Sequence, residues 1–119
     1  MKVQNYRCIE GQEVVPGVLM RVAAGPAEGA PTFVMRVFEI QPGSAIPAHN
    51  HPWEHELFVV SGRGTFISGN SKTPIEEGDT IMVLPDEPHN FVNTGEDILR
   101  IICVVPLVDG KMPGLPVTD

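Results

Sequence analysis

The 119-residue sequence has few charged residues, and basic residues are the scarcer kind. Charged residues make up 19% of the chain, and 15 acidic against 8 basic side chains give a formal net charge of −7. A chain without a basic cluster lacks the positive surface that attracts a phosphate backbone or an anionic membrane. We therefore expect neither nucleic acid nor a membrane as partner, and we expect the function to depend on a site for a small-molecule substrate.

Cysteines and long apolar runs are also scarce. Cys8 and Cys103 are far apart and form no CxxC motif, which predicts reduced thiols rather than a disulfide framework. The longest apolar run, residues 101–108, is too short to cross a bilayer, and residues 1–10 contain no apolar run of a secretory signal. These absences predict a cytoplasmic protein.

No long segment shows the apolar period of a helix, so we expect few or no helices. The chain contains 12 glycines and 12 prolines, and clusters of turn-forming residues separate short apolar segments. These strand-like segments are residues 14–24, 33–40, 56–62, 64–69, 79–84, 89–93 and 98–105. Such a pattern predicts an all-β sandwich or barrel in one domain, residues 1–119. Residues 109–119 are either a frayed tail or an arm on a partner subunit.

The last strand-like segment, residues 98–105, has two apolar faces. Because side chains alternate along a strand, the charged Arg100 marks the outward face, and Cys103 then points inward with its alternate neighbours. The face of Arg100 nevertheless also carries Ile102 and Val104. A strand that is apolar on both sides must have both faces shielded from water, by its own chain or by another subunit. We therefore expect a homodimer.

Three of the four histidines lie within the segment HNHPWEHE, residues 49–56. His49 and His51 are two positions apart, so both rings project from one face of an extended backbone, and His55 has the same parity. A break at Pro52 would let His55 approach from another side. An isolated histidine is more often structural than a ligand. Three crowded imidazoles would repel one another if protonated, however, which favours a metal site.

These histidines belong to a longer pattern. Gly43 is followed after five residues by His49-x-His51, then by three residues and His55, then by six residues and Gly62. A second pattern runs from Gly78 through Pro85 to His89-x3-Asn93. Together they resemble the two motifs of the cupin family, most closely the small single-domain cupins that carry HPWEHE. The resemblance covers about residues 33–105 and implies a jelly-roll β-barrel, usually dimeric, with a metal ion inside its wider mouth.

The resemblance implies four metal ligands: His49, His51, His55 and His89. Most cupins place a glutamate where this chain has His55, and the second motif is one residue shorter than usual. An alignment with Glu56 as the ligand stays open, although parity and the spacing to Gly62 favour His55.

Four neutral imidazoles leave the full +2 charge on a divalent ion, which suits an anionic oxygen ligand such as an enolate, phenolate or carboxylate. A six-coordinate ion also keeps two positions open, so we expect one Mn or Fe(II) ion per chain, with Zn, Ni or Cu possible in isolated protein. The family resemblance then suggests an oxidoreductase of the dioxygenase type. The alternatives are a non-catalytic metal- or ligand-binding cupin, acting as a sensor or partner subunit, and a sugar isomerase or epimerase.

Strand parity also suggests which side chains line the substrate pocket. The expected lining residues are Phe33, Met35, Val37, Trp53, Phe91, Ile101 and Cys103. Cys103 has two interpretations, an inert core thiol or a pocket residue.

Overall fold

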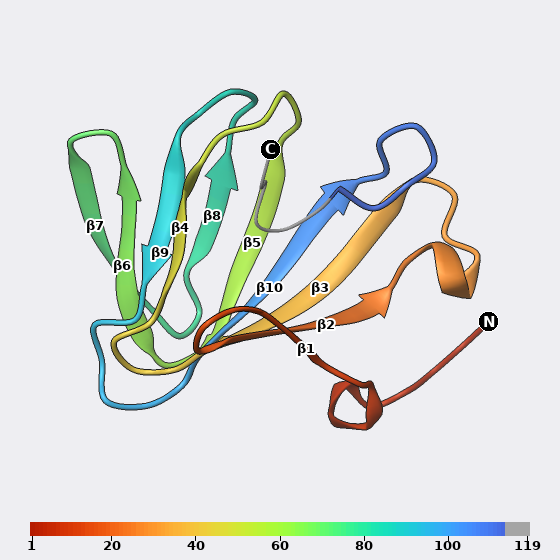
Figure 1. Cartoon of the computed structure of the whole chain (residues 1–119), viewed down its shortest axis with the longest axis horizontal. Helices are drawn as coiled ribbons and strands as arrows, with labels where there is room; N and C mark the ends of the chain where they lie inside the picture. The colour runs from red at the N-terminus through yellow and green to blue at the C-terminus, as the bar shows by residue number, and fades with distance from the viewer. Residues whose placement is uncertain (114–119) are drawn as a thin grey trace.

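The computed structural model describes residues 1–113, and in these residues all regular structure except two short 3₁₀ helices is β-strand. One sheet of six strands has the order β1-β2-β3-β10-β5-β8, and a sheet of four has the order β4-β9-β6-β7 (Figure 1). The strands of the first sheet are β1 (Gln12–Val15), β2 (Val18–Ala24), β3 (Phe33–Ile40), β10 (Leu99–Pro106), β5 (His55–Ser61) and β8 (Thr80–Val83). Those of the second are β4 (Ala45–His49), β9 (His89–Val92), β6 (Arg63–Ser68) and β7 (Ser71–Glu76). The 3₁₀ helices are η1 (Tyr6–Cys8) and η2 (Pro26–Glu28).

The all-β prediction is confirmed, with one correction to the shape. Every strand pairing is antiparallel and lies within one sheet or the other, so backbone hydrogen bonds between the described residues do not close a barrel. The two sheets instead form a sandwich that fans out from one end (Figure 1). No helix within residues 1–113 has the length and hydropathy to cross a membrane.

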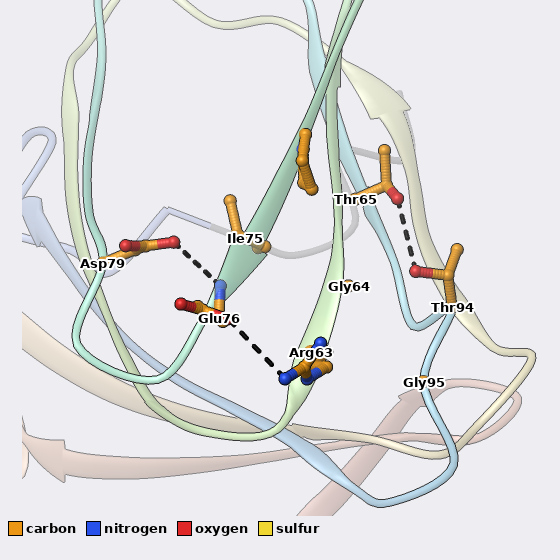
Figure 2. Close-up of a pocket in the computed structure, with 9 residues that line it drawn as sticks. Arg63, Gly64, Thr65, Ile75, Glu76, Asp79, Thr94 and Gly95 are labelled. Carbon is orange, nitrogen blue, oxygen red and sulfur yellow. Dashed lines mark hydrogen bonds and ion pairs between the residues drawn. The ribbon is translucent and has the colours of Figure 1, made fainter.

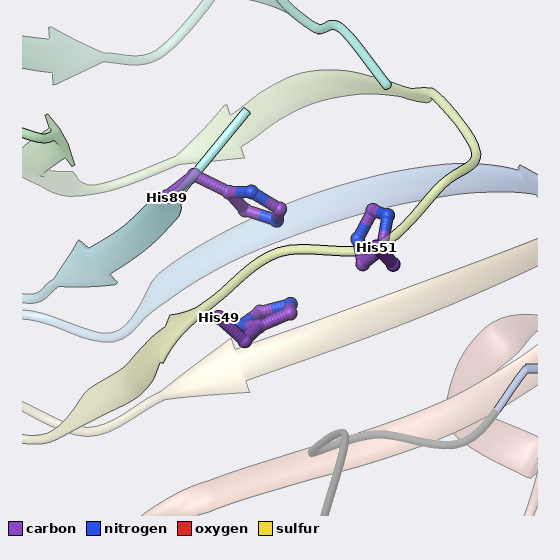
Figure 3. A group of neighbouring side chains, drawn as sticks. All are labelled: His49, His51 and His89. Atoms are coloured by element: carbon purple, nitrogen blue, oxygen red, sulfur yellow. The ribbon is translucent and has the colours of Figure 1, made fainter. Parts of the chain in front are cut away.

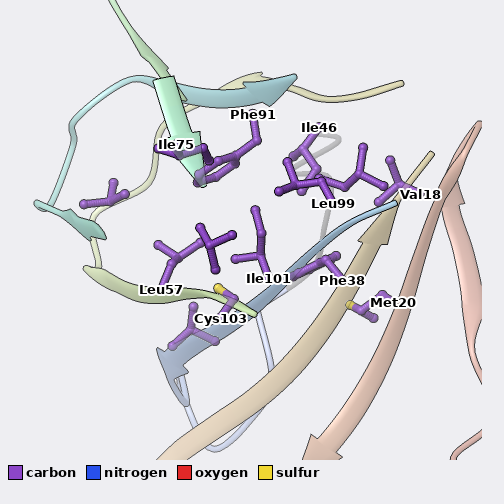
Figure 4. Packing of buried hydrophobic residues seen from close by; sticks show 14 of the residues in the cluster. Val18, Met20, Phe38, Ile46, Leu57, Ile75, Phe91, Leu99, Ile101 and Cys103 are labelled. Atoms are coloured by element: carbon purple, nitrogen blue, oxygen red, sulfur yellow. The ribbon is translucent and has the colours of Figure 1, made fainter. Parts of the chain in front are cut away.

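The hydrophobic core fills the space between the sheets (Figure 4). Inward and outward side chains alternate along β10, where Leu99, Ile101, Cys103 and Val105 are at most 1% exposed. Arg100 lies on the other face, where it bonds to Glu39. The parity predicted from Arg100 is therefore confirmed, including the inward position of Cys103. Both cysteines are free thiols, as predicted; Cys8 is exposed.

Three strand boundaries differ from the sequence expectation. Residues 14–24 do not form one strand, because Gly17 adopts a positive φ of 79° and turns β1 back onto β2. β4 carries a proline and was not expected as a strand. β7, with the polar sequence SKTPIE, was not among the expected strands either. It is an edge strand with only Ile75 buried, so apolar alternation could not mark it.

Asn93, at the end of the second motif, fixes the end of β9 against β3. Its amide nitrogen donates to the carbonyls of Ile40 and Asp97 at 2.7 and 2.8 Å, and its side-chain oxygen accepts from the backbone N–H of Gly95 at 2.9 Å. The side chain is 1% exposed. A fully bonded buried amide of this kind holds the backbone rigidly, and β9 carries His89.

The outer face of the six-stranded sheet is apolar and open. A shallow groove there runs over β5, β8 and β10, and its wall includes Phe58 and Met82, which are 44% and 52% exposed. Ile102 and Val104, the residues that led us to expect a second cover on the last strand, line the same groove. The homodimer stays a prediction, with this face as the expected contact.

We predict that Met82→Glu weakens self-association at least about tenfold, because dimerisation would bury an unpaired carboxylate. Sedimentation equilibrium over a range of protein concentrations measures the change. Thr73→Glu, which adds the same charge on the exposed edge strand β7, is the control and should behave as the wild type. A wild-type protein that stays monomeric at every concentration would contradict the prediction.

Candidate metal centre

Strand pairing brings the two histidine motifs together. In the pairing of β4 with β9, His49 lies directly opposite His89, and His51 follows two residues after the end of β4. The ring centre of His49 is 4.4 Å from that of His89 and 5.4 Å from that of His51, and the rings of His51 and His89 are 5.0 Å apart. Figure 3 shows the three rings around one point. Residues 40 positions apart in sequence thus share one site.

Hydrogen bonds to the backbone fix the tautomer of all three rings. Nδ1 lies 2.8 Å from the carbonyl of Pro47 in His49, of Trp53 in His51 and of Glu87 in His89. A carbonyl oxygen only accepts, so each Nδ1 carries the proton and each Nε2 keeps its lone pair. All three Nε2 atoms are buried and have no hydrogen-bond partner.

Those three rings fit a metal ion. One ring nitrogen from each residue can be chosen so that all three lie within 4.8 Å of one another. A hydrogen bond from the far ring nitrogen to a backbone carbonyl is the usual support of a metal-binding histidine. Buried lone pairs without donors are costly unless a cation takes them. His49, His51 and His89 therefore form a candidate site for a divalent ion.

His55 lies beside these three rings, but its ring nitrogens are not part of the cluster that theirs form. Its ring stacks on that of His51 at 4.2 Å, and its Nδ1 is 3.5 Å from the sulfur of Cys103. Its nitrogens do not join the set that meets within 4.8 Å, so His55 as a fourth ligand stays a prediction. Glu56 is exposed on the opposite face of β5, which agrees with the parity that favoured His55.

Burial favours the neutral form of His51, His55 and His89. Desolvation, together with repulsion from His51, Arg36 and other nearby positive groups, lowers the pKa of His55 to about 2. Desolvation also lowers the pKa of His89 to about 4, against the opposing effect of its bond to the Glu87 carbonyl. It lowers the pKa of His51 in the same way. Neutral rings are the form that binds metal ions.

A small, mostly apolar cavity adjoins the histidines between the sheets. Its wall consists of Arg36, Phe38, Ile46, His49, His55, Leu57, His89, Phe91, Ile101 and Cys103. Of the expected pocket residues, Phe91, Ile101 and Cys103 lie in this wall. Trp53 does not, because its ring stacks flat on His51 with centres 4.8 Å apart.

The expectation for β3 was wrong. Phe33 and Met35 are 62% and 41% exposed, and Val37, although buried, has their parity and lies outside the core cluster. The inward residues are Val34, Arg36, Phe38 and Ile40. Both faces of β3 are largely apolar, so alternation did not distinguish them. Arg36 was missed because a charged residue is normally placed outside.

A wider hollow lies elsewhere. About 510 Å³ opens beside the start of β6 and the end of β7, at the opposite end of the strands from the histidines (Figure 2). Its charged groups bind one another or the backbone: Arg63 lies 3.9 Å from Glu76, and Asp79 accepts from the backbone N–H of Glu76 at 2.8 Å. The hollow is an open surface recess, and its described lining residues do not belong to a cluster of metal ligands.

Comparison with known proteins identifies the family. The sequence-family model of the cupin domain matches residues 36–105, more than half of the chain. This chain belongs to the cupin family. Within it, an oxalate-binding protein of Thermotoga maritima is 31% identical over 71 residues, 59% of each chain. An uncharacterised protein of Methanocaldococcus jannaschii is 36% identical over 62 residues, 51% of this chain and 50% of that protein. The matches to these two curated relatives thus span only about half of their length.

Solved cupin structures agree with the fold. The polyketide cyclase RemF of Streptomyces resistomycificus superposes with a TM-score of 0.84 and 26% identity, over 89% of this chain and 79% of that one. A predicted oxalate decarboxylase of Thermotoga maritima superposes with a TM-score of 0.78 and 23% identity, over 90% of this chain and all of that one. The second likeness concerns the fold alone.

The lowered pKa values predict acid sensitivity of the metal-free protein. In the unfolded chain a histidine binds a proton near pH 6.5, whereas folded His55 and His89 stay neutral to far lower pH. The unfolded chain therefore binds more protons below about pH 6.5, and the free energy of unfolding should fall as pH falls toward about 5. Urea unfolding of metal-free protein across this window tests it. His89→Gln should flatten the dependence, and an unchanged wild-type midpoint would contradict it.

We also predict that the protein binds one divalent ion per chain through these rings. His51→Ala and His89→Ala should each weaken Mn²⁺ binding at least about tenfold, since each removes a converging ligand. Calorimetric titration and elemental analysis after dialysis measure the loss, and Cys8→Ser on the exposed surface is the control. His55→Ala decides the fourth ligand: a similar loss indicates coordination, and unchanged binding assigns His55 to the cavity wall.

Proposed function

We propose that this cupin is a metal-dependent enzyme, using Mn or Fe(II), that acts on a small organic anion in a reaction of the dioxygenase type. The observation that carries the proposal is the set of three buried, unpartnered Nε2 atoms of His49, His51 and His89. A divalent ion held there would act as a Lewis acid toward an anionic oxygen of the substrate.

The chain supplies a rigid and neutral set of donors for this chemistry. The carbonyls of Pro47, Trp53 and Glu87 hold the three rings through Nδ1, so none has to reorient when an ion binds. Because the described donors are imidazoles, they leave the charge of an ion undiminished. The apolar walls formed by Phe91 and Ile101 exclude water and strengthen the attraction between the ion and an anion.

The cavity offers no general base besides the histidines. No carboxylate lines it among the described residues. Burial raises the pKa of Cys103, so its thiol stays protonated near neutral pH. A substrate would therefore have to arrive as an anion or lose its proton as the ion binds it. This also disfavours a sugar isomerase or epimerase, which needs an acid–base residue at the reacting carbon.

A second candidate is a non-oxidative rearrangement or cyclisation assisted by the same ion. The similarity to the polyketide cyclase RemF, at 26% identity over 89% of this chain, favours it. Simple binding without turnover is the third, and the oxalate-binding relative from Thermotoga maritima supports it. All three use the histidine site, and oxygen consumption separates the first from the others. A cytoplasmic location, where both thiols would stay reduced, remains part of the proposal.

We predict oxygen uptake by the Mn- or Fe(II)-loaded protein with at least one class among diketones, catechols and activated alkenes. An oxygen electrode measures uptake, and mass spectrometry identifies products under air and under nitrogen. His51→Ala should lower the rate at least about a hundredfold, because the site loses a ligand. Cys8→Ser is the matched control. Conversion that proceeds equally under nitrogen supports the second candidate, and metal binding without conversion supports the third.

A further inference from the structure

The cavity beside the histidines contains a buried positive charge. Arg36 on β3 is 1% exposed and points between the sheets, where it forms part of the cavity wall. We propose that its guanidinium binds a carboxylate group of the substrate, so that the protein acts on small organic acids. The part of this proposal that involves a metal ion rests on the proposed function. The binding of the carboxylate rests on Arg36 alone.

Within residues 1–113, the hydrogen-bond partners of Arg36 carry no negative charge. Nη1 donates to the carbonyl of Pro113 and Nη2 to the sulfur of Cys103, each at 3.4 Å. Nε is buried and has no partner. The guanidinium also lies over the ring of Phe38, whose centre is 5.3 Å from the guanidinium carbon. None of these groups is an anion, and both hydrogen bonds are long.

An arginine cannot escape burial by losing its proton. Its pKa is too high, so the charge stays, and an unpaired buried charge is strongly destabilising. No aspartate or glutamate is among the buried residues of the described chain. A divalent ion at the neutral histidines would add positive charge to the same cavity. Among the buried described residues, the positive charge of Arg36 therefore has no negative partner, and an anionic ligand would supply one.

The position of Arg36 relative to the histidines suits one ligand that contacts both. The sulfur of Cys103 is 3.4 Å from Nη2 of Arg36 and 3.5 Å from Nδ1 of His55. One sulfur atom thus lies between the guanidinium and the ring of His55, which stacks on His51 of the metal site. Arg36 also lines the same cavity as His49 and His89, so a small acid with a second oxygen close to its carboxylate, such as a 2-hydroxy or 2-oxo acid, would face both the guanidinium and an ion at the histidines.

The size of the cavity selects the charged group. Its open volume is only about 10 Å³, close to the space that one water molecule needs. A space of this size admits a carboxylate only if the walls move apart, and a flat carboxylate can then pair with the planar fork of a guanidinium. A phosphate group is bulkier and would need more donors than Arg36 alone presents. The rest of the substrate has to extend out of the cavity.

The test compares wild type, Arg36→Met and Arg36→Lys with glycolate and with its neutral isostere glycolamide. Calorimetry measures glycolate binding to the Mn²⁺-loaded proteins, after elemental analysis has shown equal metal content. Thermal unfolding of the metal-free proteins, with and without glycolate at constant ionic strength, measures binding that needs no ion. Glycolamide controls for shape without charge.

We expect Arg36→Met to bind glycolate at least about tenfold more weakly than wild type at equal metal content, because a charge-assisted pair is lost. Arg36→Lys should be intermediate, because it keeps the charge but not the fork. Equal glycolate affinity in wild type and Arg36→Met would overturn the proposal, as would equal binding of glycolamide and glycolate to wild type. If Arg36→Met does not fold, Arg36→Lys decides, and affinity equal to wild type overturns the proposal.

Failure of the metal site would be seen separately. If no protein binds Mn²⁺, the proposed function is wrong, and the metal-free measurement decides on Arg36. Glycolate should then still raise the unfolding temperature of wild type and not that of Arg36→Met. No difference between the two would overturn the carboxylate site as well. A purely structural Arg36 would change the unfolding temperature without changing the response to glycolate.

Discussion

The site depends on three hydrogen bonds, each from a histidine Nδ1 to a carbonyl two residues away in the chain. These bonds are local, so the ring orientations are set by the short segments that carry the histidines. They leave three buried Nε2 lone pairs without a hydrogen-bond partner among the described residues. An unsatisfied buried acceptor costs about 1–3 kcal/mol, so the metal-free site lowers stability and an ion would recover it.

The locally oriented histidine rings form one site only because the sheets bring the segments that carry them together. The pairing of β4 with β9 sets His49 against His89, and Asn93 anchors the end of β9 to β3. Alternation then continues the site into the core, since His89 and Phe91 share one face of β9. The same apolar packing that stabilises the sandwich removes water from the rings and lowers the pKa of His89. Fold stability and ligand neutrality thus have a common cause.

Two arginines show how far the sequence could predict this arrangement. The assumption that a charged side chain points outward predicted the correct face of β10, because Arg100 lies on the outer face of the sheet and bonds to Glu39 there. The same rule fails in β3, because Arg36 points inward, where the sequence shows no acidic partner. The spacing of His49 and His51 predicted, from local geometry, that their rings share one face. The approach of His89 depends on strand order, which the sequence indicated only through resemblance to a family.

The distribution of charge in the molecule follows from these positions. The chain carries a net charge of −7. The buried charged and titratable side chains among the described residues are nevertheless Arg36, the thiol of Cys103 and the imidazoles of His51, His55 and His89. Acidic side chains lie outside, where water screens them, and the positive interior is poorly screened. An anion bound as proposed would therefore meet weak repulsion at the surface and strong attraction once desolvated. Such an arrangement would slow the entry of an anion and favour its retention, and it would place charge selectivity in the cavity rather than at the surface.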